Sequence, residues 1–341
     1  MAYRIGAGLA LAVLGCTATL AFAQEEPVTL YGRLHVHVES VHASGGGKPE
    51  VVRRTRVTDQ ASLLGVRGGE KLSRDLHVFY QLETGFDPQG GGGSFATRNS
   101  GVGLRGSWGS VLVGRWDSPY KTANIAVDKF HDVTIAGIKS ANEDRGNFDN
   151  RLQNVVQYWS PSFAGFSVRG AVTSNETRTN SLDPRIWAAS LAYRKGPYYA
   201  FYAHEEHRDQ KASLPKETGD SVGGKLRFGP VELGGVLQRY EKTNLEDKHS
   251  YLVSVDYHLG KSELIYQYQN AQGGGAPGGE EPDCDVNSVA YQYNFSKRTF
   301  MLALYTSIDN NDTGDCRFGA GGIGGVGQDS DGVSVGLRHV F

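Results

Sequence analysis

The sequence predicts an all-β protein, a 16-stranded antiparallel transmembrane β-barrel with short periplasmic turns and long external loops. Three observations predict this fold. The chain opens with a secretory leader, apolar and polar residues alternate along segments of strand length, and short and long connections follow one another in turn. The alternation is clear in the last strand, whose apolar positions are Val333, Val335, Leu337 and Phe341.

Residues 1–23 are predicted to be a signal peptide. Arg4 supplies the positive start, a small and apolar stretch follows, and the triplet Ala21, Phe22 and Ala23 fits the cleavage rule. Cleavage there leaves residues 24–341 as one barrel domain, in a compartment that permits disulfides. A lipoprotein leader centred on Cys16 is the alternative interpretation.

The composition excludes some classes of protein. The 35 Lys and Arg against 37 Asp and Glu argue against a nucleic-acid partner. Beyond the leader, no apolar run reaches the ~20 residues of a membrane helix. The mean hydropathy of −0.40 would suit a soluble protein, but a barrel needs apolar residues only at alternate positions. The 46 glycines and 17 tyrosines are typical of a chain with many strands and turns.

The predicted strands follow from the alternation. The first covers residues 28–39 and has His35 and His37 on its polar face. Around residues 300–308 both faces are apolar, so the sequence does not fix the register there. The other strands with clear alternation are 76–84, 251–259, 263–269 and 288–295.

The connections are predicted as seven short turns and eight long loops, the fifteen that sixteen antiparallel strands require. A soluble β-sandwich is the alternative, but sandwiches rarely use so many strands, and nothing makes their loops alternate in length. In a membrane the last strand must pair with the first, and a barrel of this width leaves an aqueous channel. The predicted long loops are 43–52, 87–97, 117–151, 174–184, 206–219, 241–248, 271–285 and 309–331.

Several segments resemble the general porins of Gram-negative outer membranes, in particular the neisserial and burkholderial type. The first strand reads VTLYG at residues 28–32, and the chain ends in GLRHVF at 336–341. The match covers the whole mature chain. Two positions depart from the family pattern, because His35 stands for an acid and Leu63 for an arginine. The other matching segments are 64–68, 81–86, 102–109, 113–115, 154–158 and 160–166.

The resemblance implies an outer-membrane homotrimer that passes small hydrophilic solutes and ions by passive diffusion. It implies that the third loop, residues 117–151, folds into the barrel and narrows the pore. It also implies that the assembly machinery reads the terminal aromatic, Phe341. The outer-membrane lipids and lipopolysaccharide would surround the barrel, and no nucleic acid and no cofactor are expected.

The candidate functional site is electrostatic. Alternation places a row of arginines on the lumen side, and the inward loop carries acids that would face them across a narrow gap with a strong transverse field. The arginine row favours the passage of anions over cations through the pore. The alternative is that the loop acids are merely solvated and balanced by the loop's own Lys and Arg. The wall residues are Arg33, Arg67, Arg105, Arg115 and Arg169, and the loop acids are Asp128, Asp132, Glu143, Asp144 and Asp149.

Cys284 and Cys316 fall in the seventh and eighth long loops, which would be neighbours at the external rim. The sequence therefore predicts a disulfide between them.

Motifs for other chemistry are weak. The G-x-G-x-x-G match at residues 101–106 lies inside a strand, where a dinucleotide site does not form. His35 and His37 share a strand face without an evident third ligand, so no metal site is expected. No enzyme is predicted. The remaining alternatives are a substrate-selective channel, which would need an aromatic track in the lumen, and an adhesin or structural barrel.

Overall fold

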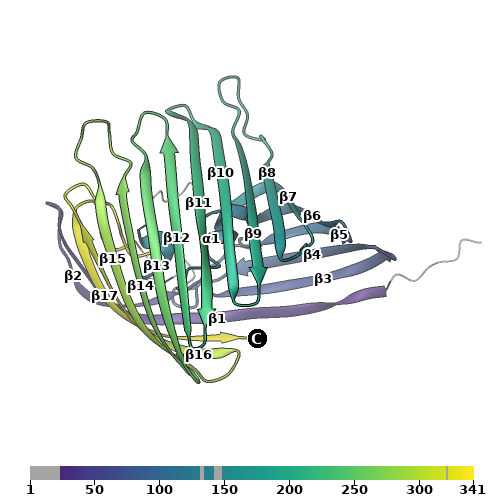
Figure 1. Cartoon of the computed structure of the whole chain (residues 1–341), viewed down its shortest axis with the longest axis horizontal. Helices are drawn as coiled ribbons and strands as arrows, with labels where there is room; N and C mark the ends of the chain where they lie inside the picture. Colours follow the sequence, from purple (N-terminus) through teal and green to yellow (C-terminus); the bar gives the residue numbers. More distant parts are fainter. Residues whose placement is uncertain (1–23, 131–133, 142–147, 320–321) are drawn as a thin grey trace, which may run out of the picture.

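The first strand, β1 (Gln24–Gly45), has paired neighbours along both edges. One edge pairs with β3 (Leu63–Ser73) over its first half and with β2 (Val51–Asp59) over its second half. The other edge pairs with β17 (Gln328–Val340). The sheet is therefore a closed antiparallel barrel (Figure 1).

The computed structural model describes residues 24–130, 134–141, 148–319 and 322–341, and it contains seventeen strands within these ranges. Because β2 and β3 occupy one place beside β1, the described strands fill sixteen positions, as the sequence predicts. No helix in these ranges is long and apolar enough to cross a membrane.

The other strands, each paired with the next along the chain, are β4 Leu76–Gly85, β5 Ser100–Gly106, β6 Gly109–Asp117, β7 Arg151–Trp159, β8 Phe166–Thr173, β9 Arg185–Lys195, β10 Tyr198–Lys211, β11 Leu214–Phe228, β12 Val231–Lys242, β13 Lys248–Leu259, β14 Ser262–Gly273, β15 Asp283–Asn294 and β16 Thr299–Asn310.

The break between β2 and β3 keeps its backbone groups paired. Ala61 has a positive φ of 61°, which interrupts the strand. The N–H of Gln60 donates to the carbonyl of His35 at 2.8 Å, and the N–H of His35 donates to the hydroxyl of Ser62 at 3.0 Å. These bonds let one barrel position carry two strands without buried unpaired backbone groups.

One predicted loop is wrong. Residues 206–219 are mostly strand, because β10 continues to Lys211 and β11 starts at Leu214. Polar side chains at the external end of a barrel do not prevent backbone pairing, so composition alone misplaced the boundary. By contrast the connection from β8 to β9, residues 174–184, is a long loop that rises at the top of Figure 1.

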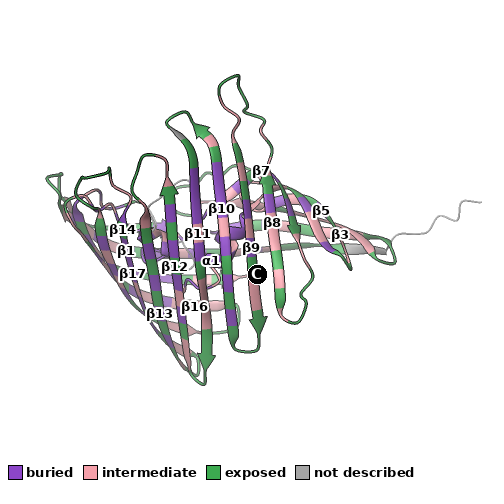
Figure 2. Ribbon diagram, turned by 45° about the horizontal axis from the view of Figure 1, so that its top comes forward, coloured by how far each residue is buried: buried purple, intermediate pink, exposed green. Residues whose placement is uncertain are grey.

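Exposure alternates along the strands, as Figure 2 shows for β10 and β12. The outward residues are apolar and exposed, such as Leu30, Val102 and Leu237, and they form the lipid-facing surface. Around residues 300–308, where the sequence left the register open, Leu302, Leu304 and Ile308 point inward and are buried. They pack against segments that fill this side of the barrel.

Candidate functional site

Strand β6 ends at Asp117, and the chain then enters the barrel as loop L3, residues 118–150. Ser118 caps the short helix α1 (Pro119–Asn124), because its hydroxyl accepts a hydrogen bond from the backbone N–H of Lys121 at 3.0 Å. Pro119 occupies the first turn, where its missing N–H costs nothing. A single turn of 3-10 helix, η1 (Ile138–Ser140), follows later in the loop.

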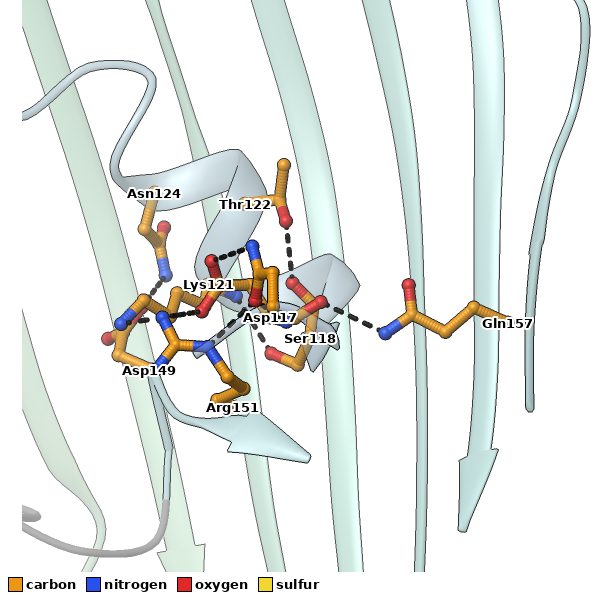
Figure 3. A network of polar contacts seen from close by, with 9 residues as sticks. Asp117, Ser118, Lys121, Thr122, Asn124, Asp149, Arg151 and Gln157 are labelled. Carbon is orange, nitrogen blue, oxygen red and sulfur yellow. Dashed lines mark hydrogen bonds and ion pairs between the residues drawn. The ribbon is translucent and has the colours of Figure 1, made fainter. Parts of the chain in front are cut away.

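The neck of L3 is held by Asp117 (Figure 3). Its carboxylate pairs with Arg151 at 3.0 Å and with Lys121 at 3.7 Å, and it accepts a hydrogen bond from the Asn99 amide at 2.8 Å. The backbone carbonyl of Asp117 accepts from the Gln157 amide at 2.9 Å. These partly buried, charge-assisted contacts fix the direction in which the loop leaves the wall.

Helix α1 lies on the inner face of β8 to β11. Tyr120 is fully buried, and its hydroxyl donates to that of Tyr240 and accepts from the Gln238 amide, both at 3.2 Å. Burial raises the pKa of Tyr120 well above its ordinary value. At the end of the helix, the Asn124 side-chain oxygen accepts from Ser221 at 2.6 Å. One side of L3 is therefore fastened to the wall.

Lys129 fastens the next part of the loop. Its ammonium group pairs with Glu232 on β12 at 2.5 Å and with Asp256 on β13. Burial alone would lower the pKa of Lys129, but the hydrogen bonds and charges of Asp256 and Glu232 outweigh it and raise the pKa. All three side chains are largely buried, so Lys129 joins L3 to two wall acids, and Lys225 adds a second positive charge 3.5 Å from Glu232.

The described loop acids are buried and accept hydrogen bonds, most of them from groups of L3. Asp128 and Asp149 are both only 2% exposed. Asp128 accepts hydrogen bonds from the backbone N–H groups of Phe130 and Ile138, each at 3.0 Å, and from the Gln267 amide of β14 at 3.1 Å. Asp149 accepts from the Asn124 amide at 3.0 Å. Their carboxylates thus lie inside the loop and away from the lumen surface, because the loop's own turns need acceptors. The other predicted loop acids, Asp132, Glu143 and Asp144, lie outside the described residues.

Loop L8, residues 311–327, packs over the tip of L3 inside the barrel. The backbone N–H of Arg317 donates to the carbonyl of Ser140 at 3.1 Å, and that of Gly319 donates to the Ser140 hydroxyl at 3.0 Å. Phe318 is fully buried together with Ile135 of L3. A disulfide joins Cys316 of this loop to Cys284 at the start of β15, with the two Cα atoms 6.1 Å apart.

Four of the five predicted wall arginines lie on the lumen side. Arg33, Arg67, Arg105 and Arg169 alternate with exposed apolar residues of the outer face. The Nε atom of Arg33 donates to the carbonyl of Ala61 at 2.8 Å. The guanidinium carbon of Arg67 lies 4.9 Å from the centre of the Tyr31 ring. The four residues come from β1, β3, β5 and β8, so they line the same part of the wall.

Arg115 is a different case. In the pairing of β5 with β6, Arg115 lies opposite Ser100, and the exposed Val113 lies opposite the exposed Val102. On the other edge of β6, the pairing with β7 shifts in register between Gly114 and Trp116. The alternation does not hold here, because Ser100 is only 7% exposed although its neighbour in the ladder, Val102, is on the outer face. The lumen position of Arg115 therefore stays a prediction.

The sequence analysis missed two lumen arginines. Arg194 lies over the ring of Tyr199, with its guanidinium carbon 4.4 Å from the ring centre, and Arg338 lies over Phe300 at 5.3 Å. The alternation in the last strand could have found Arg338, because it stands on the face opposite Leu337. The inward aromatics Trp116 and Trp159 were also missed, since both occur where strands end.

His35 and His37 lie on the inner face of β1, as the alternation predicts, and their Nε2 atoms are 2.9 Å apart. The Nδ1 atom of His37 is 2.6 Å from the Ser334 hydroxyl of β17. Within the described ranges, no group of three or more His, Cys, Asp or Glu side chains is placed to hold a metal ion.

The described geometry is that of a wide barrel with an inward loop, and comparison with known proteins agrees. The profile of the Gram-negative porin family matches residues 10–313. This chain belongs to the Gram-negative porin family. The resemblance noted in the sequence is confirmed, and the protein is an outer-membrane porin, a channel for passive diffusion.

Individual porins resemble the whole chain. Outer membrane porin protein 32 of Delftia acidovorans is 28% identical, over 98% of this chain and 99% of its own length. The solved structure of an anion-selective porin from Comamonas acidovorans is 25% identical, with a TM-score of 0.82, over 93% of this chain and all of that one. OmpT of Vibrio cholerae, solved in a trimer form, shares the fold at 14% identity, with a TM-score of 0.74, 93% of this chain and all of that one.

Proposed function

We propose that this porin is a diffusion channel that prefers anions, with its narrowest part between L3 and the arginines of the wall. Solutes would enter from the external side, lose part of their hydration at L3, and pass along Arg33, Arg67, Arg105 and Arg169. No energy source is needed. The proposal rests on the charges of the residues on the two sides of this gap, the loop L3 and the arginine wall.

In the described part of L3, no acid is exposed to the gap. The residues of L3 that keep partial exposure are neutral or basic, and the buried Asp128 and Asp149 are bonded within the loop. An arginine wall opposite a neutral or basic loop gives a positive potential in the lumen, which concentrates anions. The partly exposed loop residues are Thr122, Ile125, Ala126, Lys129, Lys139 and Asn150.

The anion preference of the Comamonas acidovorans porin supports the proposal, since that structure covers nearly all of this chain. The test is the reversal potential of the purified protein in a planar bilayer with a KCl gradient. We expect chloride to be more permeant than potassium. The variants Arg67→Gln and Arg169→Gln should each move the potential toward zero, and Arg185→Gln on the outer face should not. Selectivity unchanged in both lumen variants would overturn the proposal.

We further propose that three copies assemble into a homotrimer, as in the trimer form of OmpT. Three equal conductance steps per insertion, and a mass of three chains in detergent, would support this assembly. A single step with a monomeric mass would contradict it.

The terminal Phe341 is proposed as the signal for the outer-membrane assembly machinery. The variant Phe341→Ser should lower the amount of protein that reaches the outer membrane of living cells. Protein of the same variant refolded in detergent should still conduct, because refolding does not need the machinery.

A further inference from the structure

A pocket of aromatic rings and guanidinium groups lies in the lumen wall. Its volume is about 340 Å³, within the range of small-molecule sites. It spans β1 and β3 to β7, whereas the contacts of α1 and Lys129 lie with β8 to β13. The inward-facing residues that line it include Arg67, Gln81, Arg105, Ser110, Trp116 and Trp159. We call it the aromatic–arginine pocket.

Trp159 is the centre of the pocket. Its ring stacks with that of Phe79, with centroids 6.4 Å apart and planes at 28°, and it touches the Trp116 ring at 5.4 Å. The indole N–H donates to the Gln157 side chain at 3.0 Å, which fixes the orientation of the ring. The rings therefore form a rigid apolar surface inside a polar channel.

The positive charge lies beside this surface. The guanidinium carbon of Arg169 is 5.4 Å from the centre of the Trp159 ring, and that of Arg67 is 4.9 Å from the Tyr31 ring. Among the described residues, neither arginine forms an ion pair with a carboxylate, and Arg67 is exposed to the lumen. A guanidinium that rests on a ring keeps N–H donors at its edge for an incoming anion.

We propose that the aromatic–arginine pocket is a binding subsite for flat aromatic carboxylates, such as benzoate. The carboxylate would accept hydrogen bonds from a guanidinium of the wall, and the ring would lie against Trp159 and its neighbours. An aliphatic acid would bind through hydrogen bonds to the arginines alone, without the ring contact. This inference rests on the proposed anion-preferring channel, and it names the solute class that the channel retains longest.

The test compares two acids of equal charge and similar size. Benzoate has a π face, whereas cyclohexanecarboxylate does not. In a planar bilayer with KCl, benzoate should half-block the chloride current at a concentration about fivefold lower than cyclohexanecarboxylate, from the added ring contact. The variant Trp159→Leu should remove that difference. The matched control is Trp187→Leu, whose indole lies on the outer face, and it should behave as the wild type.

A direct binding measurement separates this inference from the channel proposal. If the bilayer shows no conductance, the proposed function fails, and calorimetric titration of the detergent-solubilised protein with each acid still tests the pocket. Tighter binding of benzoate that Trp159→Leu abolishes supports the inference. The second variant, Arg169→Gln, should weaken the binding of both acids. Equal binding of the two acids by the wild type, or a preference unchanged in Trp159→Leu, would overturn it.

Discussion

Gly32 and Phe341 exchange both backbone hydrogen bonds, each 3.0 Å long, and so close the barrel at the end of the chain. The ring of Phe341 lies directly over Gly32. A Cβ atom on Gly32 would stand 2.6 Å from the ring and 2.7 Å from the carbonyl oxygen of Leu63. This closure therefore depends on a glycine at position 32, because a residue without a side chain leaves room for the Phe341 ring to cover the backbone with which Phe341 pairs.

The variant Gly32→Ala should weaken this closure. The added methyl group collides with a ring and with backbone, and such overpacking costs about 1–3 kcal/mol. The measurement is thermal unfolding in detergent, followed by loss of the β-sheet circular dichroism signal. Gly170→Ala is the matched control, because a Cβ there meets nothing within 4 Å. Equal melting temperatures for the two variants would show that the Phe341 ring moves aside without a loss of stability.

Removing the disulfide should loosen L8 and, through it, L3. The bond between Cys284 and Cys316 closes a loop with a sequence separation of 32 residues, and the chain-entropy model gives it ~3–4 kcal/mol. The neighbouring Arg317 then reaches Ser140 of L3. We expect Cys284→Ser with Cys316→Ser to melt earlier and to show added current noise in single-channel recordings.

Reduction of the wild type by dithiothreitol should reproduce the noise of that double variant, and the variant itself should not respond to the reductant. Alkylation followed by mass spectrometry checks the premise. A free thiol on Cys284 or Cys316 in untreated protein would contradict the disulfide.

Neutralising Lys129 should affect both stability and selectivity. The variant Lys129→Met leaves Glu232 and Asp256 without the ammonium group that now pairs with both. Lys225 stays 3.5 Å from Glu232, so the charge left uncompensated is that of Asp256, and breaking a buried pair from one side costs about 3–5 kcal/mol. The Asp256 carboxylate would also attract cations. Reversal potentials should therefore shift toward potassium, whereas Lys211→Met at an exposed hairpin tip should leave them unchanged.

Strands could be predicted from the sequence because a lipid-facing residue and a lumen-facing residue must differ in polarity. In the last strand, Val333, Val335 and Leu337 are exposed on the outer face as the alternation requires. This difference in polarity disappears where other parts of the protein cover the inner face and keep water away from it. Leu302 and Leu304 point inward and are apolar because L3 and L8 cover them. No pattern within one strand reveals what a distant loop will cover.

The site was less predictable for the same reason. Arg67 and Arg169 could be placed by counting along regular strands. Arg115 could not, since it stands beside a shift in register. The roles of Asp128 and Asp149 depend on the path of L3, because a carboxylate is drawn to whichever N–H groups the folded loop leaves unpaired.

Asp149 should make the attachment of L3 sensitive to pH. Burial raises the pKa of Asp149 to about 6, above the ordinary value of 3.8. The folded protein therefore holds this proton more tightly than the unfolded chain between pH 3.8 and about 6, so the contribution of Asp149 to stability falls as the pH rises through that window. The variant Asp149→Asn keeps an acceptor for Asn124 and does not titrate. Melting temperatures measured from pH 4 to pH 8 should fall less steeply in this variant than in the wild type, and the two proteins should differ most above pH 6. Parallel melting curves across the whole range would show that Asp149 stays ionised in the folded barrel.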